Sequence, residues 1–335
     1  MHYRKPRRRE SLRFVMPLTL ALASFACGTA TAQDWPTRPV TMVVPFAAGG
    51  PIDTLGRVLQ PYLSETLGQQ IVIENIPGGG GMTGSLRVSQ AAADSHMFVL
   101  GSIGTHAISQ SMHKKPLYDS VADFQPVIVV ADAPLVLLVR KDLPAANLKE
   151  FIAYARANQD KMQFGSGGTG TSSHVGCVLL NQTIGTKVVH VPYRGGGPAL
   201  QDLIAGRIDY ICNYISTALG AVKNGQAKVL ATLAGARASA FPEVPTADEQ
   251  GLKDFDISAW NAMFMPKSTP PALVAKLNAA VAKALDNPAL EKRLDAIGLI
   301  PAAPARRTPT YLKQYVASEI KKWAEPVKAA GLSAD

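Results

Sequence analysis

Glycine-rich loops stand between a strand-like run and a helix-like run at three places in this chain. The loops are Pro45–Pro51, Ser166–Ser173 and Arg194–Gly197. The first turn of a helix leaves backbone N–H groups without intrahelical partners, at the positive end of the helix dipole. Charge-assisted hydrogen bonds contribute roughly 1.5–3 kcal/mol each, so three or four of them would supply micromolar affinity. These loops are therefore candidates for binding the carboxylate of a ligand.

The first of these loops has the clearest signals. An apolar run, Val40–Val44, is typical of a strand that is buried on both faces. After the loop, Leu55 opens an apolar stripe with helical spacing that continues to Leu67. Pro51 suits the first helical position, and Asp53 places negative charge at the positive end of the helix dipole. We expect a helix that Gly68 ends.

The same pattern recurs in the other two loops. Arg194–Gly197 follows a strand-like run and precedes Pro198, which is predicted to be the first residue of another helix. Ser166–Ser173 is rich in hydroxyl groups, which cap helices. One such loop alone indicates only turn chemistry. Three in one α/β chain favour binding, because ligands of open α/β sheets lie beyond the carboxyl ends of strands.

Four side chains near these loops each have two possible roles, one in ligand binding and one that is structural. Arg194, beside Tyr193, is the best cationic partner for a carboxylate, or else a solvated loop arginine. His106 and His174 could donate to an anion, or have helix-cap or surface roles. Phe46 packs on a ligand in one reading and seals the first loop to the core in the other.

Several other kinds of site lack support in the sequence. The spacing Gly165-x-Gly167-x-x-Gly170 matches a dinucleotide fingerprint, but residues 171–201 hold no acid for the ribose. The histidines lack close metal-ligand spacing, and no Gly-x-Ser-x-Gly elbow is present. We expect no metal, no cofactor and no catalytic residue. The enzyme alternative is a hydrolase that would use Ser166 or Ser172 with His174.

The N-terminal residues are typical of a secretory signal peptide. A basic start precedes an apolar stretch over residues 14–26, which is shorter than the ~20 residues of a membrane-spanning helix. Small residues predict cleavage near Ala32, and hence a periplasmic protein. Residues 1–32 hold six basic residues and one acid, so their removal takes the formal charge from +9 to +4. That charge is too small to indicate nucleic-acid binding.

Cys177 and Cys212 are the two cysteines that remain after cleavage. In an oxidising compartment they could form a disulfide. The alternative is a pair of buried thiols, which we favour at this stage because spacing alone cannot bring the two Cα atoms within ~7 Å.

Strand-like and helix-like segments alternate along most of the chain, which predicts an α/β fold with largely parallel sheets. We expect a break at Asp132–Pro134, between strands 124–131 and 135–139, where the chain crosses between two domains. Residues 260–265 are expected to carry the chain back. The rest of the chain after these residues is predicted to be mostly helical.

Taken together, the motifs resemble a known family of transport receptors. The residues that carry the resemblance are Val44–Gly50 with Asp53 and Arg57, Leu67–Gln69 before Val72–Asn75, Pro77–Gly81, and Val191–Gly195 with Asp209. In this order they are similar to the extracytoplasmic solute receptors of tripartite tricarboxylate transporters, the Bug receptors. The resemblance covers the mature chain from Trp35 to near its C-terminus.

This resemblance implies a type II periplasmic binding protein whose two domains close on a ligand like a Venus flytrap, with mainly parallel sheets flanked by helices. Domain I would comprise residues 33–131 and 255–335, and domain II residues 132–254. The ligand-binding residues that the loops and the resemblance imply are Phe46, Ala47, Ala48, Gly49, Gly50, Asp53, Thr54, Ser102, Thr105, His106, Ser166, Gly168, Thr169, Gly170, Thr171, Ser172, Tyr193 and Arg194.

The function expected from both lines of reasoning is the capture of a small carboxylate for membrane permease subunits. The ligand would be a di- or tricarboxylate, an aromatic acid or an acidic amino acid. The protein is expected to be a monomer. A ligand sensor that presents the same cleft to a signalling partner is the second alternative.

Overall fold

Strand β4 (Phe124–Arg140) runs through the middle of the sheet structure and joins its two parts. The computed structural model describes residues 1–3, 35–93, 96–253, 255–329 and 331–332. The signal peptide predicted for residues 1–32 falls almost wholly outside these ranges, and Trp35–Asp335 form one unit. No helix within the described ranges has the length and apolarity needed to cross a membrane.

Strands and helices alternate along this unit, as the sequence predicts. The strands are β1 (Val40–Val44), β2 (Ile71–Asn75), β3 (Met97–Ser102), β4, β5 (Gln163–Ser166), β6 (Val189–Pro192), β7 (Tyr210–Tyr214), β8 (Ala227–Thr232), β9 (Ser258–Pro266) and β10 (Ile300–Pro301). The helices are α1 (Pro51–Leu67), α2 (Met82–Ser89), α3 (Ser109–Met112), α4 (Leu148–Asn158), α5 (Ser172–Ile184), α6 (Gly196–Ile204), α7 (Ile215–Lys223), α8 (Pro271–Leu285), α9 (Pro288–Asp295) and α10 (Pro309–Ala329).

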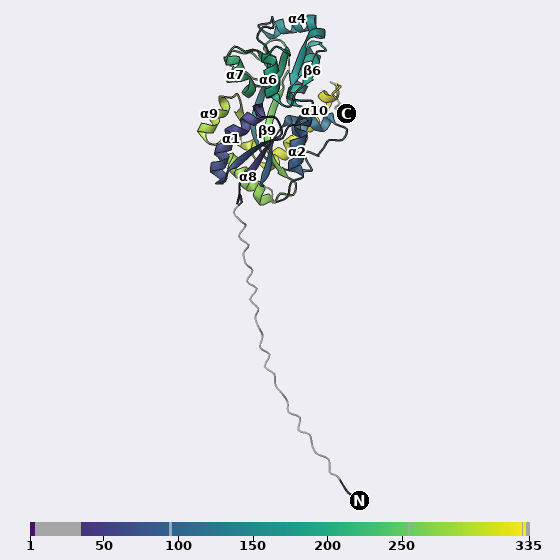
Figure 1. The fold of residues 1–335 in the computed structure, drawn as a ribbon, viewed down its shortest axis with the longest axis vertical. Coiled ribbons are helices and arrows are strands. Elements are labelled where there is room, and N and C mark those ends of the chain that lie inside the picture. The colour runs from purple at the N-terminus through teal and green to yellow at the C-terminus, as the bar shows by residue number, and fades with distance from the viewer. Residues whose placement is uncertain (4–34, 94–95, 254, 330, 333–335) are drawn as a thin grey trace. The chain divides into compact units, whose positions relative to one another are not determined.

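The strand pairing divides into two groups that share β4. In the first group the order is β2-β1-β3-β9-β4, and β10 pairs with the same end of β4. In the second, the other end of β4 lies between β7 and β8, and β5 and β6 follow β7. In Figure 1, α4, α6, α7 and β6 lie above α1, α2, α8 and α9.

The predicted break at Asp132–Pro134 is wrong, because β4 continues through these residues. Its pairing changes instead: residues up to Pro134 pair with β9, and residues from Leu135 pair with β7 and β8. Proline has no N–H to donate to the ladder, so Pro134 suits the position where one partner strand replaces another.

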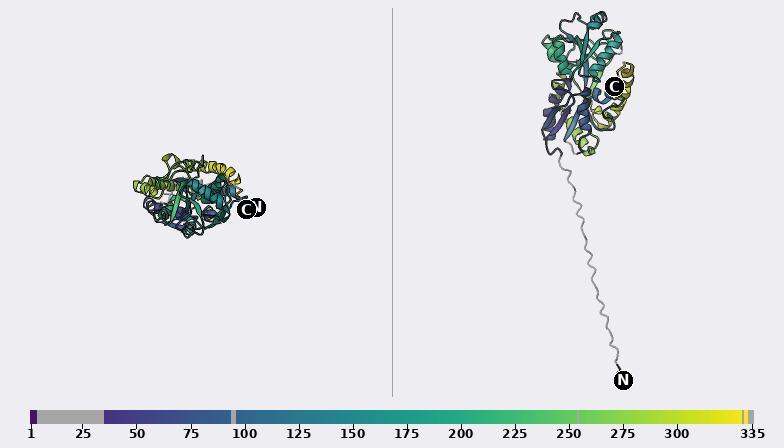
Figure 2. Two further views of the ribbon diagram at one scale, coloured as in Figure 1. Left: turned by 90° about the horizontal axis from the view of Figure 1, so that it is seen from above. Right: turned by 45° about the vertical axis from the view of Figure 1, so that its right-hand side comes forward.

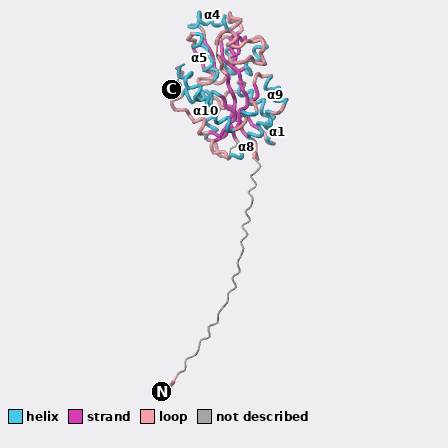
Figure 3. Tube along the Cα trace, turned by 180° about the vertical axis from the view of Figure 1, so that it is seen from behind, coloured by secondary structure: helices cyan, strands magenta, loops and turns pink. Residues whose placement is uncertain are grey.

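The sheet is mixed, with parallel pairs at its outer strands. Strands β2, β1 and β3 are parallel, as are β6, β5 and β7, which agrees with the predicted strand–helix alternation. All pairs that involve β4 or β9 are antiparallel. In Figure 3 the strands run through the middle, with α5 and α10 on one side and α1 and α9 on the other.

The fold brings together segments that lie far apart in the sequence. The C-terminal helix α10 packs against β4 and against the π-helical turn Gly104–Ile108, and Figure 2 shows it alongside the half that also contains the first strands. The indole N–H of Trp260 on β9 donates to the buried carboxylate of Glu319 on α10, at 3.0 Å. The principal core is continuous through both strand groups and includes β4 residues from Val127 to Val139.

Helix starts and ends agree with the local signals, with one exception. α1 begins at Pro51 and ends at Leu67, and Gly68 caps it with a left-handed φ of 68°. α5 has Thr171 as its N-cap, and that side chain accepts a hydrogen bond from the amide of His174. The exception is α6, which begins at Gly196 rather than at Pro198, because Gly196 and Gly197 already adopt helical geometry.

Candidate functional site

The three glycine-rich loops meet at one pocket, which we call the inner pocket. Its lining includes the first residues of three helices: Pro51 and Ile52 of α1, Ser172 and Ser173 of α5, and Gly196 of α6. The remaining lining residues are Phe46, Ser102, Gly167, Thr171, Asn213 and Tyr214. The cavity volume of the pocket is about 20 Å³, room for about one water-sized group.

The starts of α1 and α6 face each other closely because glycines lie at both, Gly49 and Gly50 just before α1 and Gly196 and Gly197 in α6. A Cβ atom on Gly196 would lie 3.1 Å from Cδ of Pro51, and one on Gly197 would lie 3.0 Å from the carbonyl oxygen of Gly49. Two positive helix ends held this near to one another repel, and an anion between them relieves the repulsion. The geometry thus favours a negatively charged ligand.

The side chains of the inner pocket are uncharged, with the apolar Phe46, Pro51 and Ile52 beside serine, threonine, asparagine and tyrosine side chains. Of the described residues that line it, none is Lys, Arg, His, Asp or Glu. The hydroxyls of Ser172 and Tyr214 lie 2.6 Å apart, and burial raises the pKa of Tyr214 to about 12, which keeps its hydroxyl protonated. A carboxylate here would be held by amides, helix dipoles and hydroxyls rather than by a cationic side chain.

The first loop is held in place by a carboxylate of the protein itself. Oδ2 of Asp53 accepts hydrogen bonds from the amide of Gly49 at 2.9 Å and from Nε of Arg57 at 2.8 Å. The Asn75 amide donates to Oδ1 of Asp53 and to the carbonyl of Phe46, both at 3.0 Å. Burial opposes the charge, but hydrogen bonds from Arg57, Gly49 and Asn75 hold the pKa of Asp53 below its ordinary value.

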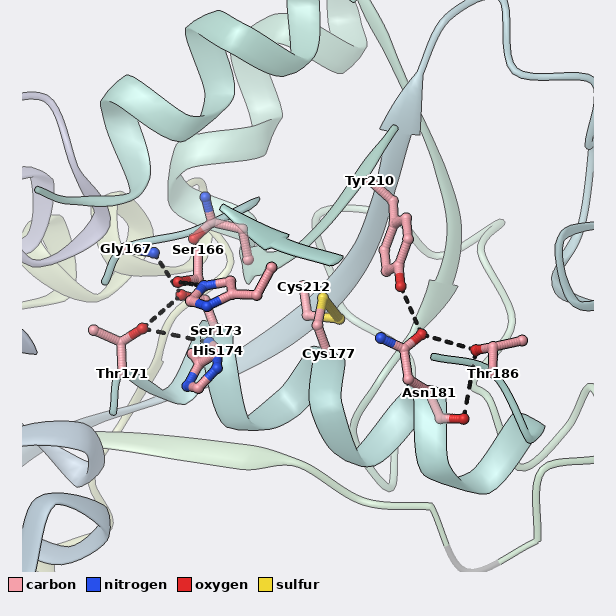
Figure 4. The surroundings of a disulfide bond; sticks show 12 residues. Ser166, Gly167, Thr171, Ser173, His174, Cys177, Asn181, Thr186, Tyr210 and Cys212 are labelled. Carbon is pink, nitrogen blue, oxygen red and sulfur yellow. Dashed lines mark hydrogen bonds between the residues drawn. A yellow bond between two sulfur atoms is a disulfide. The ribbon is translucent and has the colours of Figure 1, made fainter. Parts of the chain in front are cut away.

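The second loop is held by hydroxyl groups and an imidazole (Figure 4). Oγ1 of Thr171 donates to the carbonyl of Gly168 at 2.7 Å and lies 3.0 Å from Oγ of Ser173. The hydroxyl of Ser173 accepts the amide of Gly167 at 2.9 Å. These hydrogen bonds satisfy backbone polar groups of a buried turn that is not paired with any strand.

Loops from the two strand groups also contact each other directly. The amide of Ala47 donates to the carbonyl of Arg194 at 3.2 Å. A Cβ atom on Gly80 would overlap the carbonyl oxygen of Thr169, and Gly80 has a φ of 64°, which favours glycine. The four-glycine segment Gly78–Gly81 therefore permits a close approach between the two groups.

An outer pocket adjoins the inner one, because Phe46 and Gly167 line both. Its other lining residues are Pro77, Gly78, Gly79, Gly80, Gly81, His113, Gly168, Thr169, Pro192, Tyr193 and Arg194. Arg194 is exposed there. The hydroxyl of Tyr193 donates to Oδ2 of Asp202 at 2.7 Å, which fixes the position of its ring.

The structure divides the predicted site residues into lining and supporting residues. Eight line the two pockets: Phe46, Ser102, Gly168, Thr169, Thr171, Ser172, Tyr193 and Arg194. The others lie behind or beside this lining: Ala47, Ala48, Gly49, Gly50, Asp53, Thr54, Thr105, His106, Ser166 and Gly170. Asp53 differs most from its predicted ligand-binding role, because its carboxylate accepts hydrogen bonds from the protein's own N–H groups.

His106 is a core residue rather than an anion donor. Its ring stacks on Phe264 with 3.8 Å between centroids, and Nδ1 lies 2.8 Å from Oγ1 of Thr105. Burial lowers the pKa of His106 to about 3, so the ring is neutral. The hydroxyl of Thr105 in turn accepts the amide of Ser102 at 2.9 Å, which supports a lining residue from behind.

The sequence did not indicate Asn213 and Tyr214 as site residues. They end strand β7, and Asn213 Oδ1 accepts the amide of Tyr214 at 2.9 Å. The sequence signal that could have identified them is a polar residue, Asn213, near the end of a buried strand. Gly78–Gly81 belongs to a segment that carries the family resemblance, but it is not among the predicted site residues.

Cys177 and Cys212 form a disulfide, which corrects our preference for two free thiols. Their Cα atoms lie 5.4 Å apart, although 35 residues separate them in the chain. The bond joins α5 to β7 immediately behind the site (Figure 4). Both elements that it joins contribute lining residues.

Comparisons with known proteins place this architecture among transport receptors. Residues 55–332 match the model of the tripartite tricarboxylate transporter family receptor. A UPF0065 protein from the TAR-I ttuE–ttuC′ intergenic region of Agrobacterium vitis is 37% identical over 313 residues, covering 93% of this chain and 90% of its own.

Two solved structures are similar over nearly their whole length. The structure of MatC from Rhodopseudomonas palustris with bound malate is 41% identical with a TM-score of 0.84, covering 88% of this chain and 100% of MatC. An R. palustris protein solved with adipate is 32% identical with a TM-score of 0.85, covering 89% of this chain and 99% of that protein.

Proposed function

The chain belongs to the tripartite tricarboxylate transporter receptor family, and from this premise we propose that it is a periplasmic receptor that delivers a small dicarboxylate to the permease subunits of such a transporter. The observation that carries the choice of ligand is the convergence of three helix starts on one pocket without charged side chains. Three dipoles and their unpaired first-turn amides favour a carboxylate over a neutral group.

The second carboxylate of the ligand would lie toward the outer pocket. Phe46 and Gly167 form the boundary between the two pockets, and the exposed Arg194 lies beyond them. A guanidinium at the rim is a suitable partner for a second carboxylate. The malate and adipate bound by the two R. palustris relatives are both dicarboxylates, which supports this class for the present chain.

Closure of two domains on the ligand is part of the same proposal. Domain I is proposed as residues 33–131 and 255–335, and domain II as residues 132–254. The change of strand partners after Pro134 and the start of β9 at Ser258 support boundaries near these positions. The hydrogen bond from Ala47 to the carbonyl of Arg194 supports loops that meet when the domains close.

Export and the oligomeric state complete the proposal. The basic start and short apolar stretch of residues 1–32 support a cleaved signal peptide that ends near Ala32. The receptor would act as a monomer, with the membrane permease as its partner.

The hydrolase alternative has no support in the geometry, and the family is one of receptors. The hydroxyl of Ser172 pairs with Tyr214, and that of Ser166 lies 2.7 Å from Nε2 of His190. Burial and the charge of His174 lower the pKa of His190 to about 3. A general base needs a pKa near the working pH, so this imidazole is unsuited to activate a serine.

Calorimetric titration with malate and adipate tests the proposal, with the corresponding diamides as neutral controls. We expect micromolar binding of at least one dicarboxylate and none of its diamide. Gly196→Ala should weaken binding about tenfold or more, because its methyl group separates the starts of α1 and α6. Gly220→Ala, a helical position with open space around it, is the matched control and should bind as wild type does. Binding of neither dicarboxylate, or equal binding of the diamides, would refute the proposal.

A further inference from the structure

Two stacked imidazoles lie behind the second loop. His174 comes from α5 and His190 from β6, and their ring centroids are 4.0 Å apart with an interplanar angle of 28°. Phe164 on β5 stacks on His190 at 4.9 Å and on His174 at 6.3 Å. The stack is set by the sheet, because Phe164 and His190 are register partners in the parallel β5–β6 pair.

Each imidazole is joined to the loop by a hydrogen bond. Nε2 of His190 lies 2.7 Å from Oγ of Ser166, and that oxygen also accepts the amide of Gly168 at 3.0 Å. Nδ1 of His174 accepts the amide of Gly170 at 3.3 Å. Figure 4 shows Ser166, Thr171 and His174 close together at the start of α5.

The loop conformation depends on such external support. Gly168 and Gly170 have φ values of 122° and 81°, so the turn has no regular backbone ladder. Between them, Thr169 lines the outer pocket, and Thr171 and Ser172 line the inner one. A shift of this turn would therefore displace lining residues of both pockets.

We propose that His174 and His190 act together as positioning residues for ligand binding, by holding the Ser166–Thr171 turn in the conformation that lines both pockets. This inference depends on the proposed function for its ligand, and on the two hydrogen bonds for its mechanism. For His174, the neutral form is the competent one. An Nδ1 that accepts the Gly170 amide carries no proton, so protonation of His174 breaks that bond.

The surroundings favour neutral rings. Burial lowers the pKa of His174 to about 4, and burial followed by the charge of His174 lowers that of His190 to about 3. From β5 the pair meets Phe164 and Ser166. Tyr210 on β7, next along the stack, directs its hydroxyl to Asn181. Cys177 and Cys212, close behind, do not titrate because they are bonded to each other.

Isosteric substitutions separate the hydrogen bonds from the packing. Asn places an acceptor near the position of histidine Nδ1, and Gln places a polar group near Nε2, whereas Leu supplies neither. We expect His174→Leu and His190→Leu to weaken malate or adipate binding about tenfold each, the effect of one lost hydrogen bond. His174→Asn and His190→Gln should recover most of that affinity. Phe151→Leu, which alters the packing on the far partner of Tyr210, is the control for general destabilisation and should keep wild-type affinity.

The pH dependence of ligand affinity is a second test of the positioning role. Wild-type affinity should decrease more steeply below pH 5 than that of His174→Asn, and the comparison cancels the ionisation of the ligand. A third test is the amide hydrogen exchange of residues 166–171, measured without ligand. Exchange should be about tenfold faster in the Leu variants and near wild type in the isosteric ones.

The outcomes distinguish this inference from the proposed function. Leu variants with wild-type affinity and wild-type exchange would overturn the positioning role while leaving the receptor function intact. If wild type binds neither dicarboxylate, the receptor function fails, and the exchange rates alone decide whether the imidazole pair holds the turn. Equal losses in the Leu and isosteric variants would also overturn the inference, because packing rather than hydrogen bonding would then be responsible.

Discussion

The first and second loops reach the same pocket with opposite means of support. The turn before α1 is organised by one charged carboxylate, Asp53, which gathers N–H groups from Gly49, Arg57 and Asn75. The turn before α5 is organised by neutral hydroxyls and imidazoles, with a disulfide behind it. The comparison shows that the strand–loop–helix geometry, rather than any particular supporting residue, is what the two loops have in common.

Removing the disulfide should have the largest effect and should act on the second loop alone. Closing a loop of 35 residues contributes about 3–4 kcal/mol in the chain-entropy account. Cys177→Ala with Cys212→Ala, or a reductant on the wild type, should lower the melting temperature and increase exchange in α5. Thermal unfolding measures the first effect. Unchanged melting, or increased exchange confined to α1, would contradict the comparison.

Mild acid should also destabilise the second loop first. His174 and His190 have pKa values of about 4 and about 3 in the folded protein, below the ~6.5 of unfolded histidine. Between pH 6.5 and 4 the unfolded chain therefore binds protons that the folded chain does not, and stability decreases as the pH falls. Allowing for solvent at the half-buried His190, we expect a loss of about 2–3 kcal/mol by pH 5.

The control for this acid effect is His174→Asn combined with His190→Gln, followed by urea unfolding at several pH values. The double variant should lose less stability over this range than the wild type. The contribution of Asp53 also decreases as the pH falls, but in a lower window: it is fully present above the ordinary carboxyl pKa of 3.8 and is lost below it. Identical pH dependence in the two proteins would show that the imidazoles are not responsible.

Asp53→Asn should have a smaller effect, restricted to the first loop. It replaces charge-assisted hydrogen bonds by neutral ones and brings an amide against the N–H groups of Gly49 and Asn75, for a loss of about 2 kcal/mol. Arg57→Ala is the matched control, because Arg57 is largely exposed and its ion pair contributes about 0.5 kcal/mol. Chemical denaturation of both variants checks the order. A larger effect from Arg57→Ala would mean that the surface ion pair, not the buried bonds, supports the loop.

Local sequence signals predicted the parts of the site that are built from short segments. The start of α1 at Pro51, a hydroxyl cap for α5 from the Ser166–Ser173 loop and the meeting of glycine loops beyond strand ends all follow from residue type and spacing. Periodicity could not show that β4 is continuous, because a proline at 134 is as typical of a loop as of a change of strand partner.

Other features depend on residues that are distant in the chain. Asp53 is a supporting residue because both of its carboxylate oxygens are occupied. Asn75, 22 positions away, donates to Oδ1, and Gly49 and Arg57 donate to Oδ2. His106 is buried because Phe264, from β9, covers its ring. The disulfide depends on α5 packing against β7. None of these pairings leaves a local pattern in the sequence.

The central claim is that three helix starts hold a carboxylate in the inner pocket. A crystal structure of the protein with malate tests it most directly. We predict that one carboxylate lies among the first residues of α1, α5 and α6, within hydrogen-bond distance of backbone amides from at least two of them. Both carboxylates bound outside, on Arg194 and the surface of the outer pocket, would contradict the account.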